Sequence, residues 1–101
     1  MNGRERAELR AHAHHLSPMV HVGQHGLTPT VIGSLDDALR THELVKVKLA
    51  TKELIKPKDA ANALALATNS AVVQVIGRTA TLFRENPELQ KKSGDPPPWR
   101  R

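Results

Sequence analysis

The residues at positions 23–26, Gly-Gln-His-Gly, have types and a spacing that suit contact with a ligand. Glycines allow a backbone to approach another polymer closely, because they carry no Cβ. Thr28 and Pro29 follow, and these residue types are favoured at the N-cap and the first position of a helix. A helix N-terminus offers unpaired N–H groups and a partial positive charge to a phosphate. The stretch therefore predicts a phosphate-binding loop, although such glycines can also serve only to turn the chain.

Positive charge is the second chemical feature of the chain. Lys and Arg number 15 against 10 Asp and Glu, which gives a formal net charge of +5. Such a balance favours an anionic partner, either nucleic acid or, less often, an acidic membrane surface. Phe83 and Trp99 are the only aromatic residues. Since modules that read single-stranded bases stack them on aromatic side chains, we expect contact with the nucleic-acid backbone and weak discrimination between sequences.

Other chemistries find little support. The absence of cysteine excludes disulfides and thiolate catalysis. His12 and His15 lie three apart on an expected helix, but no further ligands converge on them, so we predict no metal site and no cofactor. Asp36 and Asp37 would point about 100° apart on a helix, which suits a solvated face better than a catalytic pair. The P-loop lysine pattern, the dinucleotide fingerprint and the G-x-S-x-G pattern are missing, so we predict that the protein is not an enzyme.

The chain length of 101 residues fits one domain, and apolar periodicity predicts the elements that would position these residues. Helices are expected over 4–15, with Leu9, Ala13 and Leu16 in line, from about 28 to 42, and from 57 to about 69. Strands are expected over 19–22, 43–50, 71–77 and 79–84, the last two forming a hairpin. We expect one domain over residues 1–85 and a basic, Pro-rich, mobile tail over 86–101.

The order α-β-α-β-α-β-β predicts an α/β fold with a four-stranded mixed sheet. Two β-α-β units imply parallel strands with right-handed crossovers. Lys46 and Lys48 alternate with apolar residues, which indicates one open sheet face and hence two layers. Because the C-terminal ends of such strands meet at one edge, the glycine loop, Lys48, Lys52 and Arg78 should converge there. Lys46 and Lys48 could equally serve only to keep the open face soluble.

Three motifs in order resemble one known family. "VGQHGLT", "HELVKVKLA" and "VVQVIGRTATLFR", together with the opening "LRAHAHHLSPMVHVG", are similar to the CRM domain (chloroplast RNA splicing and ribosome maturation). The similarity covers residues 4–84 and is greatest to the small stand-alone bacterial members of the YhbY type. It implies a fold similar to the C-terminal domain of translation initiation factor 3, and an RNA-binding protein associated with large-subunit ribosomal precursors.

The resemblance also assigns a role to the loop. The family contacts RNA through a GxxG loop, which corresponds here to Gly23, Gln24, His25 and Gly26. Many members carry Lys or Arg in this loop, whereas this chain has Gln24 and His25. The imidazole of His25 can still donate a hydrogen bond to a phosphate. The predicted RNA-binding residues are therefore these four, with Lys48, Lys52 and Arg78 supplying the flanking positive field.

Taken together, the expected function is non-enzymatic binding of ribosomal RNA of the large-subunit precursor during ribosome assembly. The alternative is a protein-interaction adaptor on ribosomal or assembly particles. No apolar run approaches the ~20 residues of a membrane span, and no signal-peptide core follows the N-terminus. We therefore expect a cytoplasmic protein that binds RNA as a monomer and has no membrane partner.

Overall fold

A computed structural model describes residues 2–23, 25–49 and 56–88. The elements follow the predicted order: α1 (Gly3–Ala13), β1 (Val20–Val22), α2 (Pro29–His42), β2 (Leu44–Leu49), α3 (Pro57–Thr68), β3 (Ala71–Ile76) and β4 (Thr79–Phe83). None of the helices in these ranges is long and apolar enough to cross a membrane.

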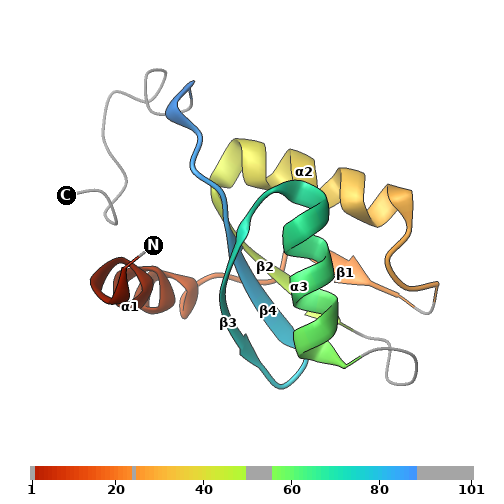
Figure 1. Ribbon diagram of the computed structural model, residues 1–101, viewed down its shortest axis with the longest axis horizontal. Coiled ribbons are helices and arrows are strands. Elements are labelled where there is room, and N and C mark those ends of the chain that lie inside the picture. Colours follow the sequence, from red (N-terminus) through yellow and green to blue (C-terminus); the bar gives the residue numbers. More distant parts are fainter. Residues whose placement is uncertain (1, 24, 50–55, 89–101) are drawn as a thin grey trace.

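The four strands form one mixed sheet in the order β1-β2-β4-β3. β1 and β2 are parallel, while β4 runs antiparallel to both of its neighbours. β3 consequently points in the same direction as β1 and β2, with β4 inserted between β2 and β3 (Figure 1). The predicted fold class, an α/β fold with a four-stranded mixed sheet, is confirmed.

One face of the sheet carries the main core, beneath α2 and α3. Apolar residues alternate along β2, so that Val45, Val47 and Leu49 are buried on this face. Leu35 and Leu39 of α2 pack against the same cluster, since they lie four apart on one helix face. The remaining buried members come from β1, α2, α3 and β4: Val20, Val22, Ala38, Ala60, Ala61, Leu64, Ala65, Ala80 and Leu82.

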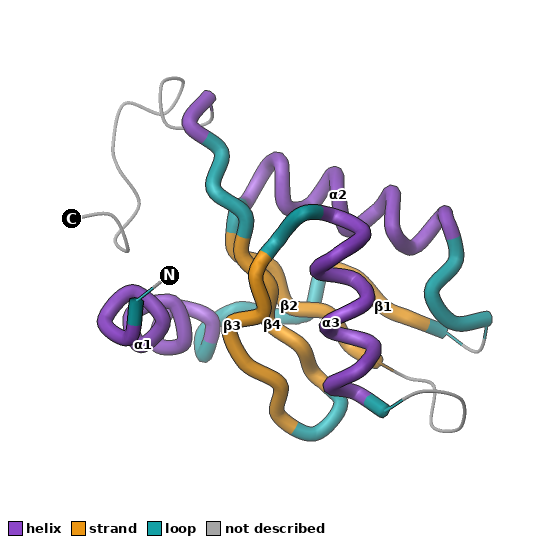
Figure 2. Tube along the Cα trace, viewed as in Figure 1, coloured by secondary structure: helices purple, strands orange, loops and turns teal. Residues whose placement is uncertain are grey.

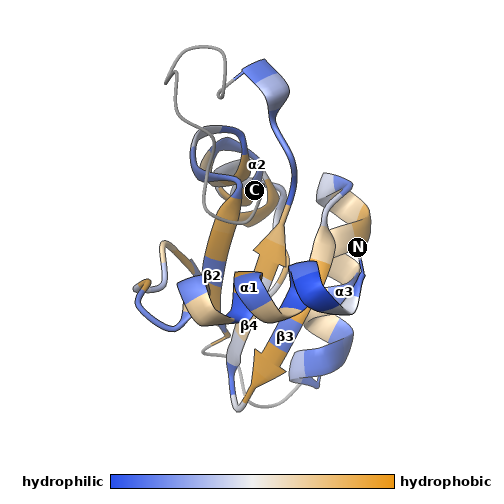
Figure 3. Ribbon diagram, turned by 90° about the vertical axis from the view of Figure 1, so that its left-hand side faces the viewer, coloured by the Kyte–Doolittle hydropathy of each residue, from blue (hydrophilic) through white to orange (hydrophobic). Residues whose placement is uncertain are grey.

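The helix α1 crosses part of the opposite face (Figure 3). Leu9 and Ala13 pack there against Leu44 and Val73, and the half-buried Phe83 lies against this smaller cluster. The helix ends at Ala13, short of the predicted residue 15. Leu16, which we predicted to continue the apolar line, is therefore displaced from it and is 41% exposed.

The guanidinium of Arg6 fixes α1 to the edge of the sheet. The register of β3 shifts between Val72 and Gln74, which leaves Val73 as an extra residue in the strand. Arg6 Nη1 donates to the carbonyl oxygens of Val72 at 2.9 Å and Val73 at 3.3 Å. The carbonyl groups at the bulge are thus hydrogen-bonded by a cationic side chain of α1.

Arg84, directly after β4, connects the two helices of the main layer. Its Nη1 donates to Asp36 Oδ1 of α2 at 2.6 Å and to the Thr68 carbonyl of α3 at 2.8 Å. Its Nη2 donates to the carbonyl of Asp36 at 3.0 Å. The side chain of Arg84 is mostly buried, so these bonds hold α2, α3 and the end of the sheet together.

The C-terminal end of α2 binds the segment that follows β4. Glu43 caps α2 with φ +64°, and its N–H donates to the Leu39 carbonyl at 2.9 Å. The buried carboxylate of Glu43 accepts from the N–H of Asn86 at 2.5 Å. Asn86 Nδ2 donates to the Arg40 carbonyl at 2.6 Å. The chain therefore stays attached to the domain as far as Asn86. Most of the predicted tail, residues 89–101, lies outside the described ranges.

Candidate nucleic-acid interface

The C-terminal ends of β1 and β2 and the β3–β4 turn lie at one edge of the sheet. Val22, the last residue of β1, pairs with Leu49, the last residue of β2. The N–H of Leu49 donates to the carbonyl of Arg78 at 2.7 Å. Gly23 follows Val22 directly, so the glycine loop begins on the β1 side of the end of β2. Arg78 lies on the opposite, β4 side of Leu49. Figure 1 shows the ends of β1 and β2 side by side. The residues from Gly23 to Pro29 and the turn at Gly77-Arg78 form the surface that we call the loop edge.

The glycine loop is a tight turn. The N–H of Gly26 donates to the carbonyl of Gly23 at 3.0 Å, which closes the four-residue turn. Gly26 has φ +74°, a conformation that L side chains rarely adopt, so a glycine is required there. Gly23 has no such restriction, and a Cβ built on it would meet nothing within 4 Å. His25 is exposed at the tip of the turn, and Gln24 lies outside the described residues.

The start of α2 follows this turn (Figure 2). Thr28 is the N-cap, as predicted, and its Oγ1 accepts from the N–H of Val31 at 3.2 Å. The N–H of Thr28 donates to the Gly26 carbonyl at 3.0 Å, and Pro29 has no N–H to offer. Several donors that we expected to face a phosphate are thus satisfied within the loop. The N–H groups of His25, Leu27 and Thr30 and the side chain of His25 make no hydrogen bond to a described residue, so they remain as donors.

Two of the three predicted basic residues lie at or next to the loop edge. Lys48 pairs with His21 of β1 and with Thr79 of β4, one residue before the end of β2. Lys48, Arg78 and His25 are all exposed. Within the described ranges, none of these three side chains makes an ion pair or a side-chain hydrogen bond. The third predicted residue, Lys52, lies outside the described residues.

Three other arginines of the fold have internal partners, unlike Lys48 and Arg78. Arg6 binds two carbonyls of β3, and Arg84 binds Asp36 and Thr68. Arg40 pairs with Asp37 at 2.7 Å on the surface of α2. A cation that is already bound to protein acceptors contributes less to a phosphate than an unpaired one. Lys48 and Arg78 therefore remain available to an anionic ligand, whereas these three arginines do not.

The structure adds two basic residues to those predicted from the sequence for this edge. Lys56 and Lys58 flank Pro57 at the start of α3 and are exposed. Since β2 and β3 point the same way, the helix that connects them must begin on the side of the sheet where β2 ends. Lys56 and Lys58 consequently lie on the same side as the loop edge. The crossover rule, applied to Pro57 as a helix start, could have identified them from the sequence.

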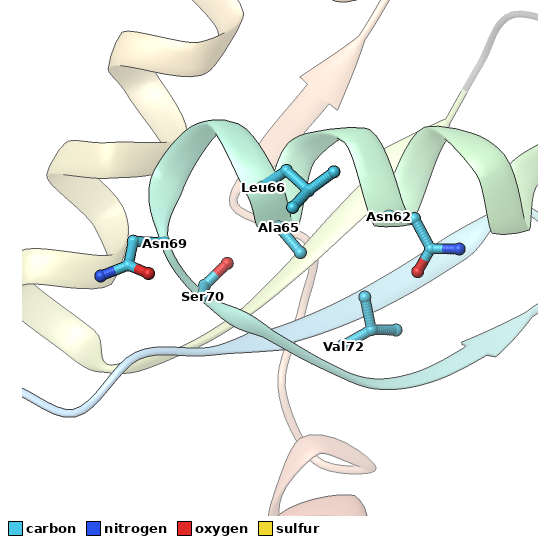
Figure 4. Close-up of a pocket in the computed structure, with 6 residues that line it drawn as sticks. All are labelled: Asn62, Ala65, Leu66, Asn69, Ser70 and Val72. Atoms are coloured by element: carbon cyan, nitrogen blue, oxygen red, sulfur yellow. The ribbon is translucent and has the colours of Figure 1, made fainter.

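A second surface feature lies away from the loop edge, between α3 and β3. It is a hollow of about 450 Å³ near the N-terminal end of β3 (Figure 4). Its lining consists of Asn62, Ala65, Leu66, Asn69, Ser70 and Val72, and Leu66 is 86% exposed. No lining residue is ionisable, so this hollow adds nothing to the electrostatics of the loop edge. Among the described residues, no three His, Asp or Glu side chains are grouped so as to hold a metal.

An α/β domain with a glycine turn and unpaired cations at one sheet edge has the features of a nucleic-acid-binding module. Comparison with known proteins identifies the class more closely. Residues 1–84 match the model of the CRS1/YhbY (CRM) domain, and the chain belongs to this family.

Several relatives are bacterial proteins of similar length. An "RNA-binding protein" of Haemophilus influenzae is 39% identical over 95 residues, covering 89% of this chain and 91% of the relative. A "Probable RNA-binding protein" of Pseudomonas aeruginosa is 37% identical over 87 residues, covering 86% of this chain and 84% of the relative. The solution structure of a Staphylococcus aureus protein, described as a candidate RNA-binding protein, superimposes with a TM-score of 0.77 at 33% identity. This match covers 90% of this chain and 95% of the Staphylococcus aureus protein.

Proposed function

We propose that this protein binds RNA through the loop edge, and that its target is ribosomal RNA of the large-subunit precursor during ribosome assembly. The observation that carries RNA binding is the convergence of the Gly23–Gly26 turn with Lys48 and Arg78, whose side chains have no partner in the described part of the chain. Relatives named as RNA-binding proteins support it. The ribosomal target rests on the family resemblance of the sequence motifs.

The geometry favours recognition of the RNA backbone. Gly23 exposes a stretch of main chain without a Cβ, and His25 can donate to a phosphate oxygen. Lys48 and Arg78 flank the turn, and Arg can bind a phosphate in a bidentate manner. These groups suit the binding of a phosphate backbone, and the proposed role is accordingly binding rather than catalysis. Affinity should accordingly fall steeply as salt concentration rises.

Crosslinking in cells tests the proposal. Ultraviolet crosslinking, followed by sequencing of the RNA and identification of the peptide, should give large-subunit ribosomal RNA attached to peptides that contain residues 21–30 or 77–79. The same chain with Gly23→Val serves as the control and should lose most of these crosslinks. Crosslinks to unrelated RNA would contradict the ribosomal target. Sedimentation with ribosomal particles that survives nuclease digestion would instead support the protein-interaction adaptor.

A further inference from the structure

The sheet face on which α1 packs contains a small polar hollow that is not part of the loop edge. Figure 3 shows β3 and β4 continuing past α1 towards their turn. His14, which directly follows α1, is one of the residues that line the hollow. Its volume is about 200 Å³, and its lining consists of His14, Lys46, Gln74, Ile76, Thr79 and Thr81. We propose that this hollow binds one unpaired nucleotide of the RNA whose backbone is held at the loop edge. The inference rests on the proposed function and assigns a subsite to it.

The strand register explains why a hollow exists at this place. Lys46 pairs with Thr81, which pairs with Gln74 on the other side. In the next row towards the loop edge, Lys48 pairs with Thr79, which in turn pairs with Ile76. Cross-strand partners lie about 4.5–5.5 Å apart, so short threonines on the central strand lie between long side chains on both neighbours. The floor of the hollow is therefore formed by β4, and its rims by β2 and β3.

The hydroxyl of Thr81 is the observation that points to a ligand. Three polar residues of the described chain are buried: Glu43, Thr68 and Thr81. The first accepts a hydrogen bond from Asn86, and Thr68 donates to the Leu64 carbonyl at 2.7 Å. Thr81 is 1% exposed, and its hydroxyl makes no hydrogen bond to any described residue. A buried hydroxyl without a partner costs free energy, so a ligand atom that satisfied it would bind favourably.

The other lining groups fit the edges and the face of a nucleobase. The amide of Gln74 both donates and accepts, and the ammonium of Lys46 donates. Ile76 is an apolar side chain, 66% exposed, that can pack against the flat face of a ring. No carboxylate lines the hollow, which suits an acceptor-rich ligand. Single-stranded bases that are turned out of a helix are recognised by this combination of face contact and edge hydrogen bonds.

Size and position agree with a single nucleotide of a longer RNA. The volume of about 200 Å³ is below the ~300–1,000 Å³ of sites for drug-sized ligands, so one ring-sized group fits. Lys48, which we place in the backbone-binding set, is the cross-strand partner of the lining residue Thr79. The hollow is therefore one step along the sheet from the cations that hold phosphate. An RNA with a bulged nucleotide next to a paired stem could occupy both sites together.

A pair of RNA hairpins tests the subsite. One has a fully paired stem, and the other has the same stem with one bulged nucleotide, made in versions with each of the four bases. Fluorescence anisotropy with the full chain should show about five- to tenfold tighter binding of at least one bulged hairpin, the effect expected of one or two hydrogen bonds. Thr81→Val and Gln74→Leu should remove this preference without changing affinity for the paired hairpin. Thr81→Val should melt at an unchanged or higher temperature.

The control and the contrary outcomes are distinct. Asn62→Leu makes the same polar-to-apolar change in the hollow between α3 and β3, and it should leave the preference for the bulge intact. Equal affinity of the unaltered chain for paired and bulged hairpins would overturn the subsite but leave the proposed function standing. A preference that survived in both Thr81→Val and Gln74→Leu would also overturn it. Failure to bind any hairpin at low salt would overturn the proposed function and the subsite together.

Discussion

Replacing Gly23 by valine should separate RNA binding from folding. A Cβ at Gly23 meets nothing within 4 Å, and the backbone there is not in the left-handed region. A compatible replacement of glycine stabilises a protein by about 0.4–1 kcal/mol, because the unfolded chain loses freedom. In a domain of this size 1 kcal/mol corresponds to about 4–8 °C in Tm. The variant should therefore melt at the same temperature as the unaltered chain or a few degrees above it.

The same change should weaken binding substantially. A valine side chain would stand between the main chain of the turn and an approaching phosphate, so at least one charge-assisted hydrogen bond would be broken. Such a bond contributes about 1.5–3 kcal/mol, which corresponds to an affinity that is roughly ten- to a hundredfold weaker. Titrations of a ribosomal RNA fragment at several salt concentrations should also show a shallower slope of log K against log salt. The slope should decrease by about 0.7–0.9 for each phosphate that the variant no longer binds.

Two other glycines provide matched comparisons. Gly26 has φ +74°, so Gly26→Val should lose RNA binding and also cost about 1–2 kcal/mol, or ~4–16 °C in Tm. Gly33 lies exposed inside α2 with open space around it, and Gly33→Ala should stabilise the helix by about 0.5–1 kcal/mol without changing affinity.

If Gly23→Val kept the affinity and the salt slope of the unaltered chain, the loop would not be the RNA-binding element. Unfolding of that variant would refute the geometry of the turn.

Three further changes probe separate parts of the structure. His25→Lys should strengthen RNA binding, because a permanent charge replaces an imidazole at the exposed tip of the turn. The slope of log K against log salt should become steeper by about 0.7–0.9 in filter-binding titrations. An unchanged slope would argue that residue 25 does not contact a phosphate. Lys48→Gln should reduce the slope by a similar amount (about 0.7–0.9) and leave the urea midpoint in place, since Lys48 has no partner among the described residues. Arg84→Met should lower the free energy of unfolding in urea by about 1–3 kcal/mol. The Asp36 carboxylate and the carbonyls of Asp36 and Thr68 lose their shared donor in this variant. An unaltered urea midpoint would show that these hydrogen bonds do not stabilise the domain.

The elements and their order followed from local signals in the sequence. The alternation from Val45 to Leu49 in β2 and the Thr28-Pro29 pair are short-range features whose physical basis acts within a few residues. The convergence of Gly23, Lys48 and Arg78 followed from the rule that strands of β-α-β units share a direction. Because that rule depends only on connectivity, it identified the edge without any knowledge of distances.

Features that depend on distant partners could not be predicted. Glu43 was expected to begin a strand, but it caps α2 at φ +64°. Its buried carboxylate accepts a hydrogen bond from Asn86, which lies 43 residues later in the chain. The N–H groups of Gly26 and Thr28 are hydrogen-bonded within the loop, and this depends on turn geometry that the residue types do not specify. The hollow around Thr81 depends on the register of three strands, which no local pattern reveals.

The bond between Arg6 and the bulge of β3 bears on how copies of this protein behave towards one another. A sheet that ends in a regular strand can be extended by a strand from another molecule, which leads to aggregation. One outer strand here, β1, has only three residues. The other, β3, is interrupted at Val73, and the carbonyls at the interruption are already bound by a guanidinium. An incoming strand would have to displace a cation and then follow an irregular template. Both outer strands of the sheet are therefore poor templates for pairing with a strand of another molecule.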